Sequence, residues 1–168
     1  MSTATTVRLP READTLAFGR RLGGVLAAGD LVLLAGPLGA GKTVLAKGIA
    51  DGLGVLGRVS SPTFIIAREH RSAPAGRGIP LVHADAYRLA GHLDELDDLD
   101  LDTELVDAVL VVEWGENMAE RLSTDHLLIR LDPQPDNSRV ATVIAHGSWE
   151  IRDWSTRIGA GERFAQLD

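Results

Sequence analysis

The sequence feature that most constrains this chain is the run Gly36-Pro37-Leu38-Gly39-Ala40-Gly41-Lys42-Thr43, which has the pattern G-x-x-x-x-G-K-T. An apolar run over 31–35 precedes it, and a helical pattern with Leu45, Ile49 and Leu53 on one face follows it. In this context the motif folds as a phosphate-binding loop. Its glycines let backbone N–H groups approach phosphate oxygens, and the helix that begins there adds its dipole. The run therefore predicts a site for nucleotide phosphates.

Two side chains of the loop have separate expected roles. Lys42 is expected to reach the β- and γ-phosphates, so it is both a binding and a catalytic candidate. The Thr43 hydroxyl is expected to ligate Mg²⁺. The expected nucleotide-binding residues extend one residue into the helix and include two further positions discussed below: Gly36, Pro37, Leu38, Gly39, Ala40, Gly41, Lys42, Thr43, Val44, Thr63 and Trp114.

Composition limits the class of protein. At 168 residues, a single domain over 1–168 is the default expectation. The chain has no cysteine, which excludes disulfides and thiol catalysis. Its net charge of −7 argues against tight binding of nucleic acid by the chain alone. The first residues do not resemble a signal peptide, and no apolar run is long enough to span a membrane.

Hydrophobic periodicity predicts alternating strands and helices. The expected strands lie around Val7 and Leu9 and over 31–35, 64–70, 79–84, 109–112, 126–131 and 139–146. The expected helices cover 11–28, the segment from the phosphate loop to Leu53, 116–122, and a C-terminal tail helix within 145–168.

Three further expectations concern how these elements assemble. The strands over 64–70 and 79–84 should form a hairpin whose tip, 72–78, is loose and mobile. The strands over 126–131 and 139–146 should form an antiparallel pair appended to the sheet. The tail helix should dock on the body with Ile151, Trp154 and Ile158 on one face.

Two carboxylates follow predicted strands and are candidates to complete a nucleotide site. Glu113 ends the apolar strand 109–112, and Asp85 follows 81–84. Ligands of open α/β sheets bind at the carboxyl ends of strands, so either acid can serve Mg²⁺ or the attacking water. The alternative for each is an ordinary surface carboxylate. Thr63, in a loop stiffened by Pro62, is either part of a switch segment or part of a simple turn.

Other polar and aromatic residues leave alternatives open. Trp114 either packs near the nucleotide or fills the core. The five histidines lack metal-ligand spacing and are interpreted as structural or exposed: His70, His83, His92, His126 and His146. The segment 91–105 carries seven acids interleaved with leucines. It is either a solvated helix face or an acidic surface for a basic partner.

Several classes of phosphate-loop protein have further sequence motifs, and the absence of such a motif from this chain argues against the class. A GTPase is disfavoured because guanine recognition needs an Asn/Thr-Lys-x-Asp segment, and no lysine follows Lys47. A small-molecule kinase stays open, with Arg68, Arg71 and Arg77 as candidates for its lid. A nucleotide-gated interaction module with little turnover is the third alternative.

Four motifs in order carry a resemblance to a known family: GPLGAGKT at 36–43, SPTF at 61–64, DAYRL at 85–89 and VEW at 112–114. Over about residues 10–145 the chain resembles TsaE (older name YjeE), the bacterial ATPase of tRNA threonylcarbamoyladenosine synthesis. Pro37 departs from the family pattern, where an Asp is common, and the tail after Gly147 matches nothing in it.

The resemblance implies a fold, an activity and partners. It implies a mixed α/β P-loop fold with a central parallel group, antiparallel additions and flanking helices. It implies a cytoplasmic, Mg²⁺-dependent ATPase that acts on TsaB and TsaD and meets tRNA only through that complex. TsaD transfers threonylcarbamoyl to adenosine 37, and TsaE supports its turnover.

The resemblance also carries over site residues. Lys42 and Thr43 become the phosphate and Mg²⁺ contacts, and Thr63 belongs to a switch-like loop. Asp85 and Glu113 become the essential acids around Mg²⁺ and water, with their individual roles left open. Trp114 becomes a neighbour of the nucleotide.

Overall fold

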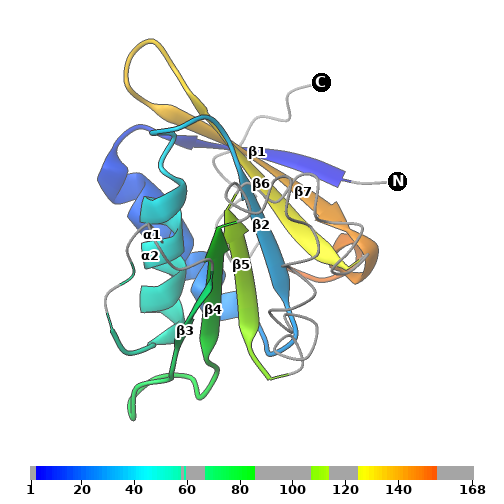
Figure 1. The fold of residues 1–168 in the computed structure, drawn as a ribbon. Coiled ribbons are helices and arrows are strands. Elements are labelled where there is room, and N and C mark those ends of the chain that lie inside the picture. Colours follow the sequence, from blue (N-terminus) through cyan, green and yellow to red (C-terminus); the bar gives the residue numbers. More distant parts are fainter. Residues whose placement is uncertain (1–2, 58, 60–66, 86–106, 114–124, 155–168) are drawn as a thin grey trace.

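The described part of the chain is built on a seven-stranded mixed sheet in the computed structural model (Figure 1). The structure describes residues 3–57, 59, 67–85, 107–113 and 125–154. The strands are β1 (Thr3–Leu9), β2 (Leu31–Ala35), β3 (Ala67–His70), β4 (Leu81–Asp85), β5 (Val109–Glu113), β6 (His126–Pro133) and β7 (Arg139–His146). Their order across the sheet is β1-β7-β6-β2-β5-β4-β3.

The centre of the sheet is parallel and its edges are antiparallel. Strand β2 pairs in parallel with both β5 and β6, and β4 pairs in parallel with β5. Strands β2 and β5 are apolar and buried along their length, as expected for parallel strands covered on both faces. The predicted mixed sheet with a central parallel group is confirmed. The predicted antiparallel pair of β6 and β7 is also confirmed, and β6 joins this pair to the sheet by pairing in parallel with β2.

Two helices, α1 (Glu12–Val25) and α2 (Lys42–Leu53), lie side by side next to the sheet (Figure 1). Their backbones touch through glycines: Gly19 and Gly23 of α1 face Gly48 and Gly52 of α2. A Cβ on Gly52 would lie 2.2 Å from the Arg20 carbonyl oxygen. Only glycine permits this approach, and the approach determines where α2, and the loop before it, sit on the core.

The connection between β3 and β4 is held against the helices, so the prediction of a loose tip over 72–78 is wrong. The Arg77 guanidinium donates to the carbonyl oxygens of Gly23, at 2.7 Å, and Leu26, at 2.5 Å. Its backbone N–H donates to the Leu53 oxygen at 3.1 Å. These bonds satisfy carbonyls at the C-terminal ends of both helices, which otherwise lack partners.

The C-terminal segment docks on the body through its tryptophans. After β7 the chain forms a 3₁₀ turn over Gly147–Glu150, and Trp149 and Trp154 are buried. Arg152 stacks on Trp149 at 3.6 Å and pairs with Asp30 at 2.8 and 3.0 Å. The segment up to Trp154 therefore packs on the body, and the rest of the predicted tail helix lies outside the described residues. The predicted helical face is wrong for Ile151, which is 90% exposed and lies after the turn.

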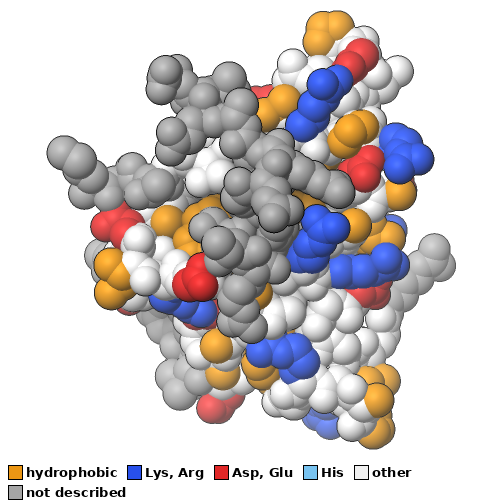
Figure 2. All heavy atoms as spheres, turned by 180° about the vertical axis from the view of Figure 1, so that it is seen from behind, with side chains coloured by type: hydrophobic (Ala, Val, Ile, Leu, Met, Phe, Trp, Pro, Cys, Tyr) orange, Lys and Arg blue, Asp and Glu red, His pale blue; other side chains and the backbone are white. Residues whose placement is uncertain are grey.

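Several predicted features lie outside the described residues: the helix over 116–122, the acidic segment 91–105, and Ile158. None of the helices in the described ranges combines the length and apolar character needed to cross a bilayer. On the face shown in Figure 2, basic side chains occur as separate groups between acidic and apolar ones.

Candidate functional site

The phosphate loop joins β2 to α2 and depends on its glycines for shape. Gly36, Gly39 and Gly41 have φ values of +140°, +80° and +104°. These values are unfavourable for residues that carry a Cβ. A Cβ on Gly36 would in addition lie 2.5 Å from the carbonyl oxygen of Leu131 in β6. The loop therefore lies directly on the end of β6, with Gly41 as the N-cap of α2.

Lys42 curls back over this loop. Its ammonium donates to the carbonyl oxygens of Gly36, at 2.5 Å, and Pro37, at 3.3 Å, and the residue is only 5% exposed. One positive charge is thus held beside the N-terminal end of α2, where the helix dipole is also positive. Leu38 of the same loop, by contrast, is 92% exposed. The arrangement concentrates positive potential where the motif predicts phosphates.

Glu113 lies beside the start of α2. It is the last residue of β5, and the register of β5 on β2 pairs it with Leu34, just before the loop. The Thr43 hydroxyl donates to Glu113 Oε1 at 3.2 Å, and Glu113 is 5% exposed. Glu113 is therefore not a surface carboxylate. The loop hydroxyl and the strand-end acid, which the sequence singles out separately, are thus in contact.

His83 is the second partner of Glu113 and was missed by the sequence interpretation. From the middle of β4 its Nε2 lies 2.5 Å from Glu113 Oε2, and both side chains are buried. A carboxylate can only accept, so Nε2 carries the hydrogen of this contact. His83 is buried, which agrees with the structural interpretation of the histidines, but that interpretation did not include its contact with Glu113. The sequence did offer one signal for this contact. His83 is a polar residue inside an otherwise apolar predicted strand, and another predicted strand ends in the acid Glu113.

The remaining predicted site residues are less fully described. Asp85 is the last residue of β4, and its backbone pairs in register with Glu113, so the two strand ends lie side by side. The side chain of Asp85 lies outside the described part of the structure, as do Thr63 and Trp114. Their expected roles stay predictions.

Arg139 also reaches the phosphate loop, and the sequence interpretation missed it. It is the first residue of β7. Its Nε donates to the Ala40 carbonyl oxygen at 3.0 Å, and its Nη2 donates to that of Gly39 at 3.3 Å. A guanidinium thus braces the outside of the loop, whereas Lys42 lies over its carbonyls at 36 and 37.

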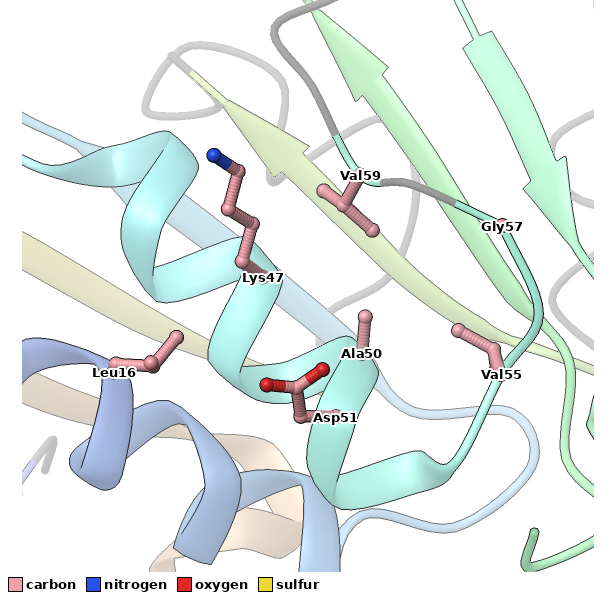
Figure 3. A pocket seen from close by; sticks show the side chains of 7 residues that line it. All are labelled: Leu16, Lys47, Ala50, Asp51, Val55, Gly57 and Val59. Carbon is pink, nitrogen blue, oxygen red and sulfur yellow. The ribbon is translucent and has the colours of Figure 1, made fainter. Parts of the chain in front are cut away.

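A separate hollow lies beside α2 and contains the other lysine of the chain (Figure 3). Its volume is about 440 Å³. Figure 3 shows Lys47 and Asp51 of α2 among the residues that line it, together with apolar side chains that include Leu16, Val55 and Val59. None of the residues that line this hollow belongs to the cluster of Thr43, Glu113 and His83. The two lysines of α2 therefore lie in different environments: Lys42 at the phosphate loop and Lys47 at the hollow.

A central parallel sheet, a G-x-x-x-x-G-K-T loop between β2 and α2, and a strand-end acid bonded to the loop threonine define a P-loop protein of the α/β class. The chain belongs to the TsaE family. Residues 9–141 match the family model described as threonylcarbamoyl adenosine biosynthesis protein TsaE.

Relatives of the same name extend over most of the chain. It is 54% identical to tRNA threonylcarbamoyladenosine biosynthesis protein TsaE of Mycobacterium tuberculosis over 156 residues, covering 89% of this chain and 86% of the relative. The protein of that name from Streptomyces coelicolor is 53% identical over 150 residues, covering 89% and 93%. Among solved structures, the crystal structure of Bacillus subtilis YdiB superposes with a TM-score of 0.76 and 29% identity, covering 95% and 96%.

Proposed function

We propose that the chain is an Mg²⁺-dependent ATPase that supports N6-threonylcarbamoyladenosine formation at position 37 of tRNA by acting on a TsaB–TsaD complex. The observation that carries the ATPase part is the contact of Thr43 with Glu113 beside the phosphate loop. Membership of the TsaE family supports the tRNA-modification part. Since tRNA is modified and used in the cytoplasm, the proposal includes a cytoplasmic location.

ATP suits the loop for reasons of charge and shape. The glycine-built loop at the start of α2 favours polyanions, because backbone N–H groups and the helix dipole act together there. In the proposed complex the Lys42 ammonium exchanges its bonds to Gly36 and Pro37 for bonds to β- and γ-phosphate oxygens. A lysine already held at the loop needs little reorganisation to make that exchange.

Mg²⁺ suits the donors at the same place. Thr43 Oγ1 and Glu113 Oε1 are oxygen donors 3.2 Å apart, and Mg²⁺ prefers oxygen ligands combined with substrate phosphates. The proposed ligands are Thr43 and one or both of the strand-end acids, Glu113 and Asp85. When bound, the metal neutralises charge on the phosphate oxygens.

The chain's own residues supply the remaining parts of hydrolysis. In the proposal, one of the two acids orients the attacking water and accepts its proton. His83 holds the Glu113 carboxylate from the side opposite Thr43, so the carboxylate keeps one orientation. Lys42 stabilises the charge that develops on the transferred phosphoryl group.

The proposed partners are TsaB and TsaD homologues, with tRNA reached only through them. The net charge of −7 suits a protein that docks on other proteins better than one that grips tRNA. The acidic segment 91–105 is the candidate docking surface on sequence grounds. Reversing Asp97 and Asp98 to Lys should weaken assembly with TsaB–TsaD in gel filtration and leave nucleotide binding intact. Unchanged co-elution would remove this surface from the proposal.

One assay tests the function against its alternatives. Phosphate release from ATP is measured with the chain alone and with TsaB and TsaD, with and without Mg²⁺. The proposal expects Mg²⁺-dependent release that rises with the partners. A small-molecule kinase would instead produce a phosphorylated acceptor, and a nucleotide-gated module would bind ATP without turnover under all conditions. Arg77 is one of the arginines that a kinase could use in its lid. In the structure its guanidinium donates to carbonyl oxygens at the C-terminal end of α1.

A further inference from the structure

Arg139 connects two segments that are far apart in the chain. Its Nε and Nη2 donate to the carbonyl oxygens of Ala40 and Gly39 in the phosphate loop. Its Nη1 donates to the carbonyl oxygen of Asn137 at 2.8 Å, in the turn between β6 and β7. The guanidinium of Arg139 therefore joins the phosphate loop to the turn between β6 and β7.

The consequence for the loop follows from peptide geometry. Each peptide unit is planar and trans, so its N–H points away from its C=O. Holding the Ala40 carbonyl on the Arg139 side directs the Gly41 N–H to the opposite side. The Ala40 N–H meanwhile donates to the Pro37 carbonyl at 3.1 Å and closes a turn within the loop. The contacts of Arg139 thereby hold two consecutive peptide planes, 39–40 and 40–41, in one orientation.

Arg139 is anchored in the sheet on both sides, and the turn before it is closed by hydrogen bonds. In the sheet register, Arg139 pairs with Leu9 of β1 and with Pro133 of β6. In the preceding turn, Asp136 accepts bonds from the Ser138 hydroxyl at 2.5 Å and from its backbone N–H at 3.0 Å. A planar guanidinium on such a base loses little further freedom when it bonds two carbonyls at once.

We propose that Arg139 is a positioning residue for nucleotide binding: from β7 it holds the phosphate loop in the shape that receives the polyphosphate of a nucleoside di- or triphosphate. This inference rests on the proposed function and adds a residue to the same site. Arg139 acts through the loop backbone, so its effect falls on nucleotide affinity more than on the rate of the bound complex.

The test compares Arg139→Ala and Arg139→Lys with a matched control, Arg8→Ala. Arg8 is exposed and forms an ion pair with Asp136 on the same turn, without a contact to the loop among the described bonds. Dissociation constants are measured by titration with fluorescent ADP and ATP. Steady-state ATP hydrolysis with TsaB and TsaD gives KM and kcat. Melting curves with and without ADP show whether each variant folds and responds to nucleotide.

The expected result is a split between affinity and turnover. Arg139→Ala should raise the dissociation constant and KM about tenfold, because two bonds from a charged donor are lost. Its kcat at saturating ATP should stay within about twofold. Arg139→Lys keeps the positive charge but not the planar guanidinium that bonds two carbonyls at once. Its dissociation constant should therefore lie between those of the parent chain and Arg139→Ala. Arg8→Ala should match the parent chain.

Three results would overturn the inference. The first is a folded Arg139→Ala variant with unchanged nucleotide affinity. The second is a variant whose melting temperature falls but whose increase on adding ADP is unchanged, since that is a purely structural effect. The third applies if Arg139→Ala does not fold: a folded Arg139→Lys variant with the parent affinity. A parent chain that binds neither nucleotide would instead contradict the proposed function itself.

Discussion

The Thr43 hydroxyl lies 3.2 Å from Glu113 Oε1, although the two residues are 70 positions apart in the chain. The parallel pairing of β2 and β5 produces this contact, because it places the last residue of β5 next to Leu34, two residues before the loop begins. His83, from the next strand, holds the other carboxylate oxygen of Glu113. Side chains from α2 and β4 thus converge on one carboxylate at the end of β5.

Replacing Glu113 by Gln should separate binding from turnover. The amide keeps the size of the side chain but loses the negative charge that a Mg²⁺ ligand or a proton acceptor needs, so ATP hydrolysis with partners should fall about 100-fold. Nucleotide affinity should change far less, because the loop and Lys42 remain. Fluorescent-nucleotide titration and phosphate release measure the two quantities. Equal losses of binding and turnover would contradict the role given to Glu113.

Substitutions of His83 should show whether it orients Glu113. His83→Leu removes the donor and leaves a buried carboxylate short of one partner, so kcat should fall about tenfold. The free energy of unfolding should also fall. His83→Gln retains an N–H donor and should recover part of the turnover. Identical kinetics for the two variants would show that the hydrogen bond does not matter.

The two lysines of α2 allow the expected phosphate contact of Lys42 to be tested against a control at Lys47. Lys42→Ala should weaken ATP and ADP binding about 100-fold, because it removes the buried charge held at the loop. Lys47→Ala removes the same charge five residues further along α2, beside the hollow of Figure 3, and should leave affinity nearly unchanged. Isothermal titration calorimetry of both variants decides this. A comparable loss in Lys47→Ala would mean that overall charge, not position, controls binding.

The glycine contact between α1 and α2 predicts opposite effects for two Gly→Ala changes. At Gly52 a Cβ would meet the Arg20 carbonyl at 2.2 Å, so Gly52→Ala should lower the free energy of unfolding by about 1–3 kcal/mol. At Gly24 a Cβ would meet nothing within 4 Å, and Gly24→Ala should raise it by about 0.5 kcal/mol through helix propensity. Urea unfolding measures both. A stability loss at Gly24 as large as that at Gly52 would exclude helix contact as the cause.

His70 should make the fold less stable in mild acid. Burial lowers the pKa of His70 below its ordinary value of 6.5. His70 Nδ1 donates to the Leu56 carbonyl, and Nε2 is buried with no partner among the described residues, so a proton there would find no acceptor. As pH falls through 6.5 the unfolded chain binds this proton first, and stability decreases.

The control for this pH effect is His70→Gln, which does not titrate. Its free energy of unfolding, measured in urea, should fall less than that of the parent chain between about pH 7.5 and about pH 5.5. Parallel pH profiles for the two proteins would show that His70 does not contribute to the acid sensitivity.

Local patterns were sufficient for much of the fold. The apolar run 31–35, the glycine-lysine-threonine loop and the helix after it appear where periodicity and motif predict them. Glu113 was recognisable because an acid directly after four buried apolar residues needs a reason to be there. The hairpin tip at 72–78 was misjudged, because its turn-forming composition does not show that Arg77 finds two helix ends to bond.

The sequence by itself determined the phosphate loop and the acid at the end of β5, because each is encoded in a short run of residues. It also determined membership of the TsaE family, because the order of the motifs along the chain can be recognised without knowing which of them meet in space. Only the tertiary structure decided the partners of those residues. The order of the strands places His83 next to Glu113, and β7 places Arg139 next to the carbonyls of Gly39 and Ala40. The contact between the glycines of α1 and α2 sets the position of α2. The physical reason is that a hydrogen bond between distant segments depends on which strands become neighbours, and hydrophobic periodicity does not specify that choice.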